Sequence, residues 1–123
     1  MSRVLGAGLL VIVALLLAGH LASEFWRRYY QTDWAAARIQ MTNFGQAINN
    51  YRMINEALPL SLEDLLETDD RNPHPYIDSI PTDPWGSDYD YEVLDAEHYV
   101  IRSRGEDGEA DTSDDIVYPG MDR

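Results

Sequence analysis

The stretch WAAARIQMTNFGQAINNY, residues 34–51, decides the fold. Its apolar residues recur every three or four positions, at Trp34, Ala37, Met41, Phe44, Ile48 and Tyr51. This spacing is typical of an α-helix that buries one face. It predicts an amphipathic helix over residues 23–56, which ends before Pro59 because proline disfavours helical geometry in the residue before it. Packing on its own domain is the preferred interpretation of the stripe, over a cofactor role for Trp34 or Met41.

Towards the N-terminus lies an uncharged apolar segment, VLGAGLLVIVALLLAGHLA, residues 4–22. As a helix it would span about 28 Å, close to the roughly 30 Å of a bilayer core. The segment therefore predicts a transmembrane helix over residues 4–22, with residues 1–3 in the cytoplasm. The small residues of GAG, residues 6–8, offer a contact face for a neighbouring helix. An interfacial belt of aromatic side chains is expected at Phe25, Trp26, Tyr29 and Tyr30.

Residues 57–123 are predicted to form a small globular part. Ser61 followed by Asp64 resembles a capping box, at the start of a short helix that carries Leu62, Leu65 and Leu66. Residues 71–88 are rich in Pro, so a loop is expected there. The runs YDYEVLD and EHYVIRS alternate polar with aromatic or β-branched residues, as in a β-hairpin around Ala96. The predicted fold class is α+β: an N-terminal transmembrane helix continues into a long amphipathic helix packed on a small antiparallel β-sheet.

Charge is distributed unevenly along the chain. The whole protein has a formal net charge of −13, and residues 41–123 hold five Arg against twenty acidic residues. Because basic residues are not clustered, no nucleic-acid partner is expected. Six acids fall close together, at Glu106, Asp107, Glu109, Asp111, Asp114 and Asp115. From the residues alone this run is either a solvated acidic loop or a site that binds a cation.

Three segments, in this order, resemble the C-terminal domain of the major pseudopilins of type II secretion systems, the family usually called GspG. They are YRMINEALPLSLEDLL (51–66), PYIDSIPTDPWGSDYDY (75–91) and YVIRSRGEDGEADTSDDI (99–116). The resemblance covers about residues 38–117 and implies a type IV pilin-like fold. The family's middle motif is matched at Pro81, Asp83, Pro84, Trp85, Gly86, Tyr89 and Tyr91. Within it Trp85, Pro84 and Tyr89 are expected to be structural, with the Trp85 indole filling the small core between helix and sheet.

The resemblance also implies that the acidic loop, residues 103–116, binds Ca²⁺. Carried over by position, the side-chain ligands are Asp107 and one or both of Asp114 and Asp115. The backbone carbonyl of Arg104, and carbonyls or hydroxyls between residues 109 and 113 with Ser113 among them, are expected to complete the shell. Calcium binds six to eight oxygen atoms, and glycines in a loop let backbone carbonyls supply some of them. Bound calcium is therefore the preferred explanation of the acidic run.

The sequence shows no catalytic constellation, since it has no cysteine, no G-x-S-x-G and no phosphate-binding loop. The chain is therefore predicted not to be an enzyme and to have no small-molecule substrate. His20 is an ionisable residue within the predicted span, which makes it a candidate ligand for the metal of a haem or chlorophyll. It lies in the last turn of the span, where an imidazole can reach the interface instead, and this is the preferred interpretation.

The N-terminus departs from the pattern of that family, in which a leader ends in Gly and the apolar stretch follows it. Gly19 and Glu24 have the family's spacing, but the apolar segment precedes Gly19. The chain is therefore expected neither to be cut by a prepilin peptidase nor to polymerise. Two functions stay open. One is a structural or accessory subunit that packs against other subunits of a larger integral membrane complex; the alternative is an atypical pseudopilin of a type II secretion or type IV pilus system.

Two arguments bear on topology. Arg27 and Arg28 after the span, against Arg3 before it, mildly favour a cytoplasmic domain. The resemblance implies the opposite, because pseudopilin domains lie outside the cytoplasm, where calcium is plentiful. We expect a single-pass protein of the cell inner membrane with its C-terminal domain in the periplasm.

Overall fold

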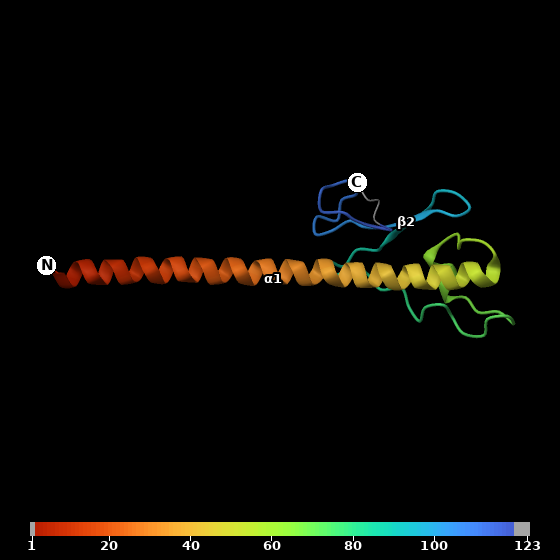
Figure 1. Ribbon diagram of the computed structural model, residues 1–123, viewed down its shortest axis with the longest axis horizontal. Coiled ribbons are helices and arrows are strands. Elements are labelled where there is room, and N and C mark those ends of the chain that lie inside the picture. The colour runs from red at the N-terminus through yellow and green to blue at the C-terminus, as the bar shows by residue number, and fades with distance from the viewer. Residues whose placement is uncertain (1, 120–123) are drawn as a thin grey trace. The chain divides into compact units, whose positions relative to one another are not determined.

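The computed structural model describes residues 2–119, without the side chains of residues 2–5 and 30. A long helix, α1 (Ser2–Asn55), is followed by the short 3-10 helix η1 (Leu62–Leu66) and by three strands, β1 (Asp90–Val93), β2 (Tyr99–Ser103) and β3 (Ile116–Tyr118) (Figure 1). The chain divides after Thr32 into two compact units, and α1 contributes to both. The predicted α+β class, a long N-terminal helix with a small antiparallel sheet, is confirmed.

The first unit is a stretch of α1 whose apolar side chains are exposed. The large apolar residues between Leu9 and Leu21 are 44–72% exposed. From Gly6 onward, α1 contains a segment that is long and apolar enough to cross a membrane, judged by length and composition. A continuous apolar surface of this kind is unfavourable in water and favours contact with lipid or with another apolar surface.

The predicted aromatic belt follows this segment directly. Phe25, Trp26 and Tyr29 are exposed, and successive rings make edge contacts at centroid distances of 6.2 and 6.3 Å. The side chain of Tyr30 lies outside the described residues, as does Met1. The three described rings are therefore exposed, as interfacial side chains would be.

The core of the second unit forms on the predicted stripe of α1. Its members from Ala37 to Ile48 are at most 4% exposed. Trp34 and Tyr51, at the two ends of the stripe, are only partly buried. The stripe packs against apolar side chains from the rest of the chain, which are Leu58, Leu62, Leu65, Tyr89, Ile101 and Ile116. The prediction that this face packs on its own domain is confirmed.

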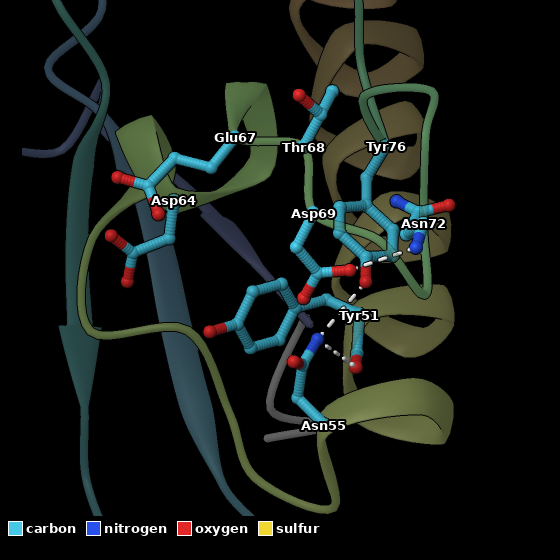
Figure 2. Close-up of a pocket in the computed structure, with 8 residues that line it drawn as sticks. All are labelled: Tyr51, Asn55, Asp64, Glu67, Thr68, Asp69, Asn72 and Tyr76. Atoms are coloured by element: carbon cyan, nitrogen blue, oxygen red, sulfur yellow. Dashed lines mark hydrogen bonds between the residues drawn. The ribbon is translucent and has the colours of Figure 1, made fainter.

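Hydrogen bonds of Asn55 connect the C-terminal end of α1 to the proline-rich loop. Asn55 Nδ2 donates to the backbone carbonyl of Tyr51 and to the hydroxyl of Tyr76, both at 3.0 Å. Figure 2 shows these contacts in a small pocket, which is also lined by acidic residues of η1 and the loop after it. The two tyrosine rings pack with their centroids 5.2 Å apart. The amide therefore ties the end of the helix to the proline-rich loop, which gives a physical reason for a Tyr and an Asn four residues apart at this point.

The short leucine-rich helix is a 3-10 helix. The Asp64 carboxylate accepts hydrogen bonds from the backbone N–H groups of Leu60 (2.8 Å) and Ser61 (3.3 Å), which supplies the acidic half of the predicted capping box. Residues three apart share a face in a 3-10 helix. For this reason Leu62 and Leu65 are buried, whereas Leu66 is 38% exposed.

The strands form an antiparallel sheet in the order β1-β2-β3. The first two make the predicted hairpin around Ala96. The third was not predicted, although Ile116–Tyr118 consists of the β-branched and aromatic types that favour strands. Because Ser103 at the end of β2 pairs with Ile116 at the start of β3, the sheet holds the two ends of the acidic loop side by side.

Candidate calcium site

The acidic loop is folded back on itself by residues in left-handed geometry. Gly105 has φ +65°, Gly108 has φ +67° and Asp111 has φ +66°. Two of the three are glycines, which adopt this geometry without a steric penalty. The turns bring the far end of the loop, around Asp114, back against its beginning.

Three of the loop's carboxylates converge. Asp107, Asp114 and Asp115 each offer an oxygen, and these three atoms lie within 4.8 Å of one another. Two ligands of the same calcium ion, each about 2.3–2.6 Å from the metal, are at most about 5 Å apart. The three oxygens therefore lie close enough together to bind one ion.

The loop's own hydrogen bonds hold these carboxylates in place. Asp114 Oδ2 accepts the backbone N–H of Asp107 at 3.0 Å. The Thr112 hydroxyl donates to Asp114 Oδ1 at 2.5 Å and also lies 3.2 Å from Asp115 Oδ1. The Thr112 and Asp107 hydrogen bonds lower the pKa of the Asp114 carboxyl below its ordinary value. Asp114 is therefore ionised at neutral pH, as a calcium ligand must be.

The structure brings together all three of the predicted side-chain ligands. The other two candidates are Ser113 and the backbone carbonyl of Arg104. Ser113 is exposed, and the hydroxyl found between the carboxylates belongs to its neighbour Thr112. The guanidinium of Arg104 forms a two-point pair with Asp90, with both contacts at 2.8 Å. The role expected for the Arg104 backbone carbonyl stays a prediction.

Gly105 lies so close to Asp114 that no residue with a side chain fits at this position. A Cβ at this position would overlap both the backbone carbonyl and the carboxylate of Asp114. The close approach therefore allows the loop to close around its three carboxylates. Carboxylate and hydroxyl oxygens in a loop of this kind are the donors that calcium prefers. The residues present fit a calcium ion.

Replacing Gly105 by alanine is expected to destabilise the domain by more than the backbone geometry alone explains. A left-handed residue with a Cβ costs about 1–2 kcal/mol, and the overlap with Asp114 adds to that. Gly108→Ala is the matched control, because its φ is nearly the same but a Cβ there meets only Ser87 Oγ, at 3.7 Å. Thermal unfolding of the full chain in detergent micelles measures both losses. If the two losses are equal, the glycine at position 105 is needed only for its φ.

A buried aspartate ties the beginning of this loop to the turn Asp83–Ser87. Asp83 is 3% exposed. Its Oδ1 accepts the backbone N–H groups of Trp85 (3.1 Å) and Ser87 (2.8 Å), and its Oδ2 accepts the hydroxyl of Ser103 at 2.7 Å. The Ser103 hydroxyl oxygen in turn accepts the N–H of Gly105 at 3.3 Å. The sequence pattern alone assigns no role to Asp83, because its partner Ser103 on β2 is remote in the chain.

The expected position of the Trp85 indole is corrected by the structure. Trp85 and Pro84 are only partly buried, and the Trp85 ring meets the edge of Trp34 at the margin of the core, with centroids 6.5 Å apart. The indole thus packs against the edge of the core and does not fill its centre. Tyr89 lies there instead, 7% exposed, with its ring 5.3 Å from that of Phe44. Its structural role is the one expected.

The histidines do not join this cluster. His20 is an exposed residue of α1, and His98 pairs with Asp95 at 2.8 Å. Among the side chains that the structure describes, one group of three or more His, Cys, Asp or Glu residues could hold a metal ion. It consists of Asp107, Asp114 and Asp115. Binding of a haem or chlorophyll at His20 stays an untested alternative.

Most of this chain matches one family of known proteins. The family model described as Type II secretion system (T2SS), protein G matches residues 25–118. The chain belongs to this family. The Type II secretion system core protein G of Escherichia coli (strain K12) is 30% identical over 129 aligned positions, which cover 92% of this chain and 88% of that protein. The resemblance stated from the sequence is thus confirmed.

A solved structure of a protein G relative agrees with the fold. The crystal structure of the major pseudopilin from the type 2 secretion system of enterohaemorrhagic Escherichia coli superposes with a TM-score of 0.62 at 26% identity. The match covers 76% of this chain and 91% of that one. The α+β architecture is therefore that of a protein G pseudopilin.

Proposed function

We propose that this protein is a non-enzymatic structural subunit of a type II secretion system. A single span over residues 4–22 anchors it in the inner membrane, and its calcium-binding domain lies in the periplasm. The observation that carries the proposal is membership of the protein G family over residues 25–118, together with three convergent carboxylates in the loop between β2 and β3. A subunit of this kind works through the surfaces that it presents to other subunits, and its ion would serve to keep the domain folded.

The membrane anchor is supported by the exposed apolar face of the first unit. The residues from Leu9 to Leu21 leave a continuous apolar surface, and GAG at residues 6–8 has open space around both glycines. Lipid would cover most of this surface. A neighbouring transmembrane helix could approach closely at the glycines.

The periplasmic location is supported by the chemistry of the acidic loop. A site of mixed oxygen donors, in which Asp107 is the exposed member of the three clustered carboxylates, resembles the extracellular modules that bind calcium only at about 10⁻⁴–10⁻³ M. Such a site is filled outside the cytoplasm. Arg27 and Arg28, which lie within the aromatic belt, favour the opposite orientation, but they exceed the single Arg3 before the span by only one arginine, so the bias is weak.

Because the chain has no cysteine, single cysteines can report its topology. Ala96→Cys places a thiol on the exposed hairpin turn, and Ser2→Cys places one at the opposite side of the span. In intact spheroplasts, a maleimide that cannot cross the membrane is expected to label Ala96→Cys at once and Ser2→Cys only after lysis. The reverse pattern would put the domain in the cytoplasm and remove the argument for a filled calcium site.

Two modes of assembly remain as candidates. The order of the apolar segment and Gly19 favours an unprocessed subunit that packs beside a larger integral membrane complex. The second candidate is a pseudopilin that joins a filament. The observation in its favour is the alignment with the Escherichia coli protein G, which covers 92% of this chain. Residues 25–123 are only about 80% of the chain, so the alignment must extend into the apolar segment before residue 25. Co-expression with a prepilin peptidase separates the two by intact mass. A processed chain becomes shorter, whereas an accessory subunit keeps its full mass and copurifies with its complex in mild detergent.

A further inference from the structure

Arg102 lies on β2, and its guanidinium reaches the acidic loop. Its Nη1 is 3.1 Å from Asp111 Oδ1, and its Nε is 3.7 Å from Asp115 Oδ2. The Asp111 side chain is 82% exposed, but that of Asp115 is only 8% exposed. Asp115 belongs to the cluster of three carboxylates. A fixed positive charge of the protein therefore lies beside a candidate calcium ligand.

The contact between Arg102 and Asp115 is one of charge and not of hydrogen bonding. A separation of 3.7 Å is too long for a hydrogen bond, and Arg102 Nε is buried without a hydrogen-bond partner among the described residues. The Asp115 oxygens instead accept the backbone N–H of Asp111 at 2.8 Å and the Thr112 hydroxyl at 3.2 Å. Each carboxylate oxygen has two acceptor positions, so both keep one for an ion. Arg102 thus supplies positive charge to the cluster without using its metal-binding positions.

We propose that Arg102 is a built-in counter-ion that competes with calcium, so that it stabilises the metal-free loop and lowers the loop's affinity for the ion. This inference rests on the calcium site proposed above. Without an ion, the guanidinium offsets repulsion among the carboxylates. With an ion bound, it repels a divalent cation held by the same Asp115. By linkage, the free energy that Arg102 contributes to the metal-free loop is subtracted from calcium binding.

The consequence is a site that fills only where calcium is abundant. The folded domain would keep its loop ordered through Arg102 where calcium is scarce and take up the ion where calcium is abundant.

Calcium titration of the full chain in detergent micelles, followed by calorimetry, tests the inference. Arg102→Gln is expected to lower the Kd for calcium roughly tenfold and to lower the melting temperature in EDTA. Arg102→Lys keeps the charge and should stay close to the wild-type Kd. Arg71→Gln is the matched control, because it removes the same charge from an arginine paired with Asp69 in another loop, at 3.3 Å. Its Kd should change less than about twofold, since distant surface charges are screened.

An unchanged or higher Kd in Arg102→Gln would overturn the inference and make Arg102 a residue that positions Asp115. If Arg102→Gln does not fold in EDTA, the wild-type protein gives a second readout. The NMR signal of its Arg102 Nε–H should shift when calcium is added. A signal that does not shift would also overturn the inference. Failure of the wild type to bind calcium removes the proposed site and the competition with it. Wild-type binding that is insensitive to Arg102 removes the competition alone.

Discussion

Calcium is expected to raise the melting temperature of the domain by roughly 10–20 °C relative to EDTA, measured on the full chain in detergent micelles. The loop from Gly105 to Asp115 has almost no apolar side chain to bury, so only its hydrogen bonds and Arg102 oppose the repulsion of its carboxylates. A ligand at about 100 times its Kd stabilises the folded state by about 2.7 kcal/mol. For a domain of this size each kcal/mol corresponds to about 4–8 °C.

Asp107→Asn should remove most of this calcium-dependent gain. Asparagine keeps an oxygen that can accept the N–H of Glu109, a hydrogen bond that Asp107 Oδ1 makes at 2.9 Å, but it removes the charge that binds the ion. In EDTA the variant should melt at the wild-type temperature or slightly above it, because one repulsive charge is gone. A loss that appears in calcium and not in EDTA identifies Asp107 as a ligand.

Glu109→Gln is the matched control for Asp107→Asn. It removes one carboxylate from the same loop, at an exposed residue whose contacts with Asp107 and Thr112 are made by its backbone. Most of the calcium-dependent gain should survive.

Magnesium should replace calcium poorly, because it requires a tighter octahedral shell than a mixed loop offers. If the wild type melts at one temperature in calcium and in EDTA, the acidic run is only a solvated loop.

The elements that the sequence predicted correctly are those encoded by neighbouring residues. The stripe from Trp34 to Tyr51 needs only the helical period, and the hairpin around Ala96 needs only alternation and a turn. Both are confirmed. The convergence of Asp107, Asp114 and Asp115 was implied by the family resemblance, and the structure provides the geometry for it through Gly105.

What the sequence did not provide are contacts between remote residues and choices between neighbours. The bond between Asp83 and Ser103 joins positions twenty residues apart, so no local pattern announces it. Ser113 and Thr112 carry the same functional group, and in the structure the Thr112 hydroxyl is the one that bonds to the carboxylates. The predicted position of Trp85 was wrong for a related reason. Its size favours the core, but the ring packs at the margin of the core against Trp34.

Asp83→Ala is expected to destabilise the domain by roughly 4 kcal/mol or more, the largest loss foreseen for a single substitution here. The change removes the acceptor of two backbone N–H groups and of the Ser103 hydroxyl, in a residue that is 3% exposed. Each buried donor left without a partner costs about 1–3 kcal/mol. Thermal unfolding in micelles measures the loss, and Trp85 provides a fluorescence signal from the turn itself.

Asp83→Asn separates the hydrogen bonds from the charge. Its amide oxygen can still accept from Trp85 and Ser87, and its NH₂ can donate to Ser103, whose hydroxyl can reverse its role. We expect this variant to lose about 1–2 kcal/mol. If asparagine costs as much as alanine, the carboxylate charge itself is required, and the hydrogen-bond explanation is wrong.

Asp83 should also affect calcium binding, although it is not a ligand. Ser103 connects it to Gly105, and Gly105 lies against Asp114, so the turn supports the first residues of the loop. In Asp83→Ala the increase in melting temperature produced by calcium is therefore expected to be smaller than in the wild type. Asp83→Asn, which keeps this chain of contacts, should retain the increase. If calcium stabilises Asp83→Ala as much as the wild type, the turn and the loop are energetically independent, and Asp83 stabilises only its own turn.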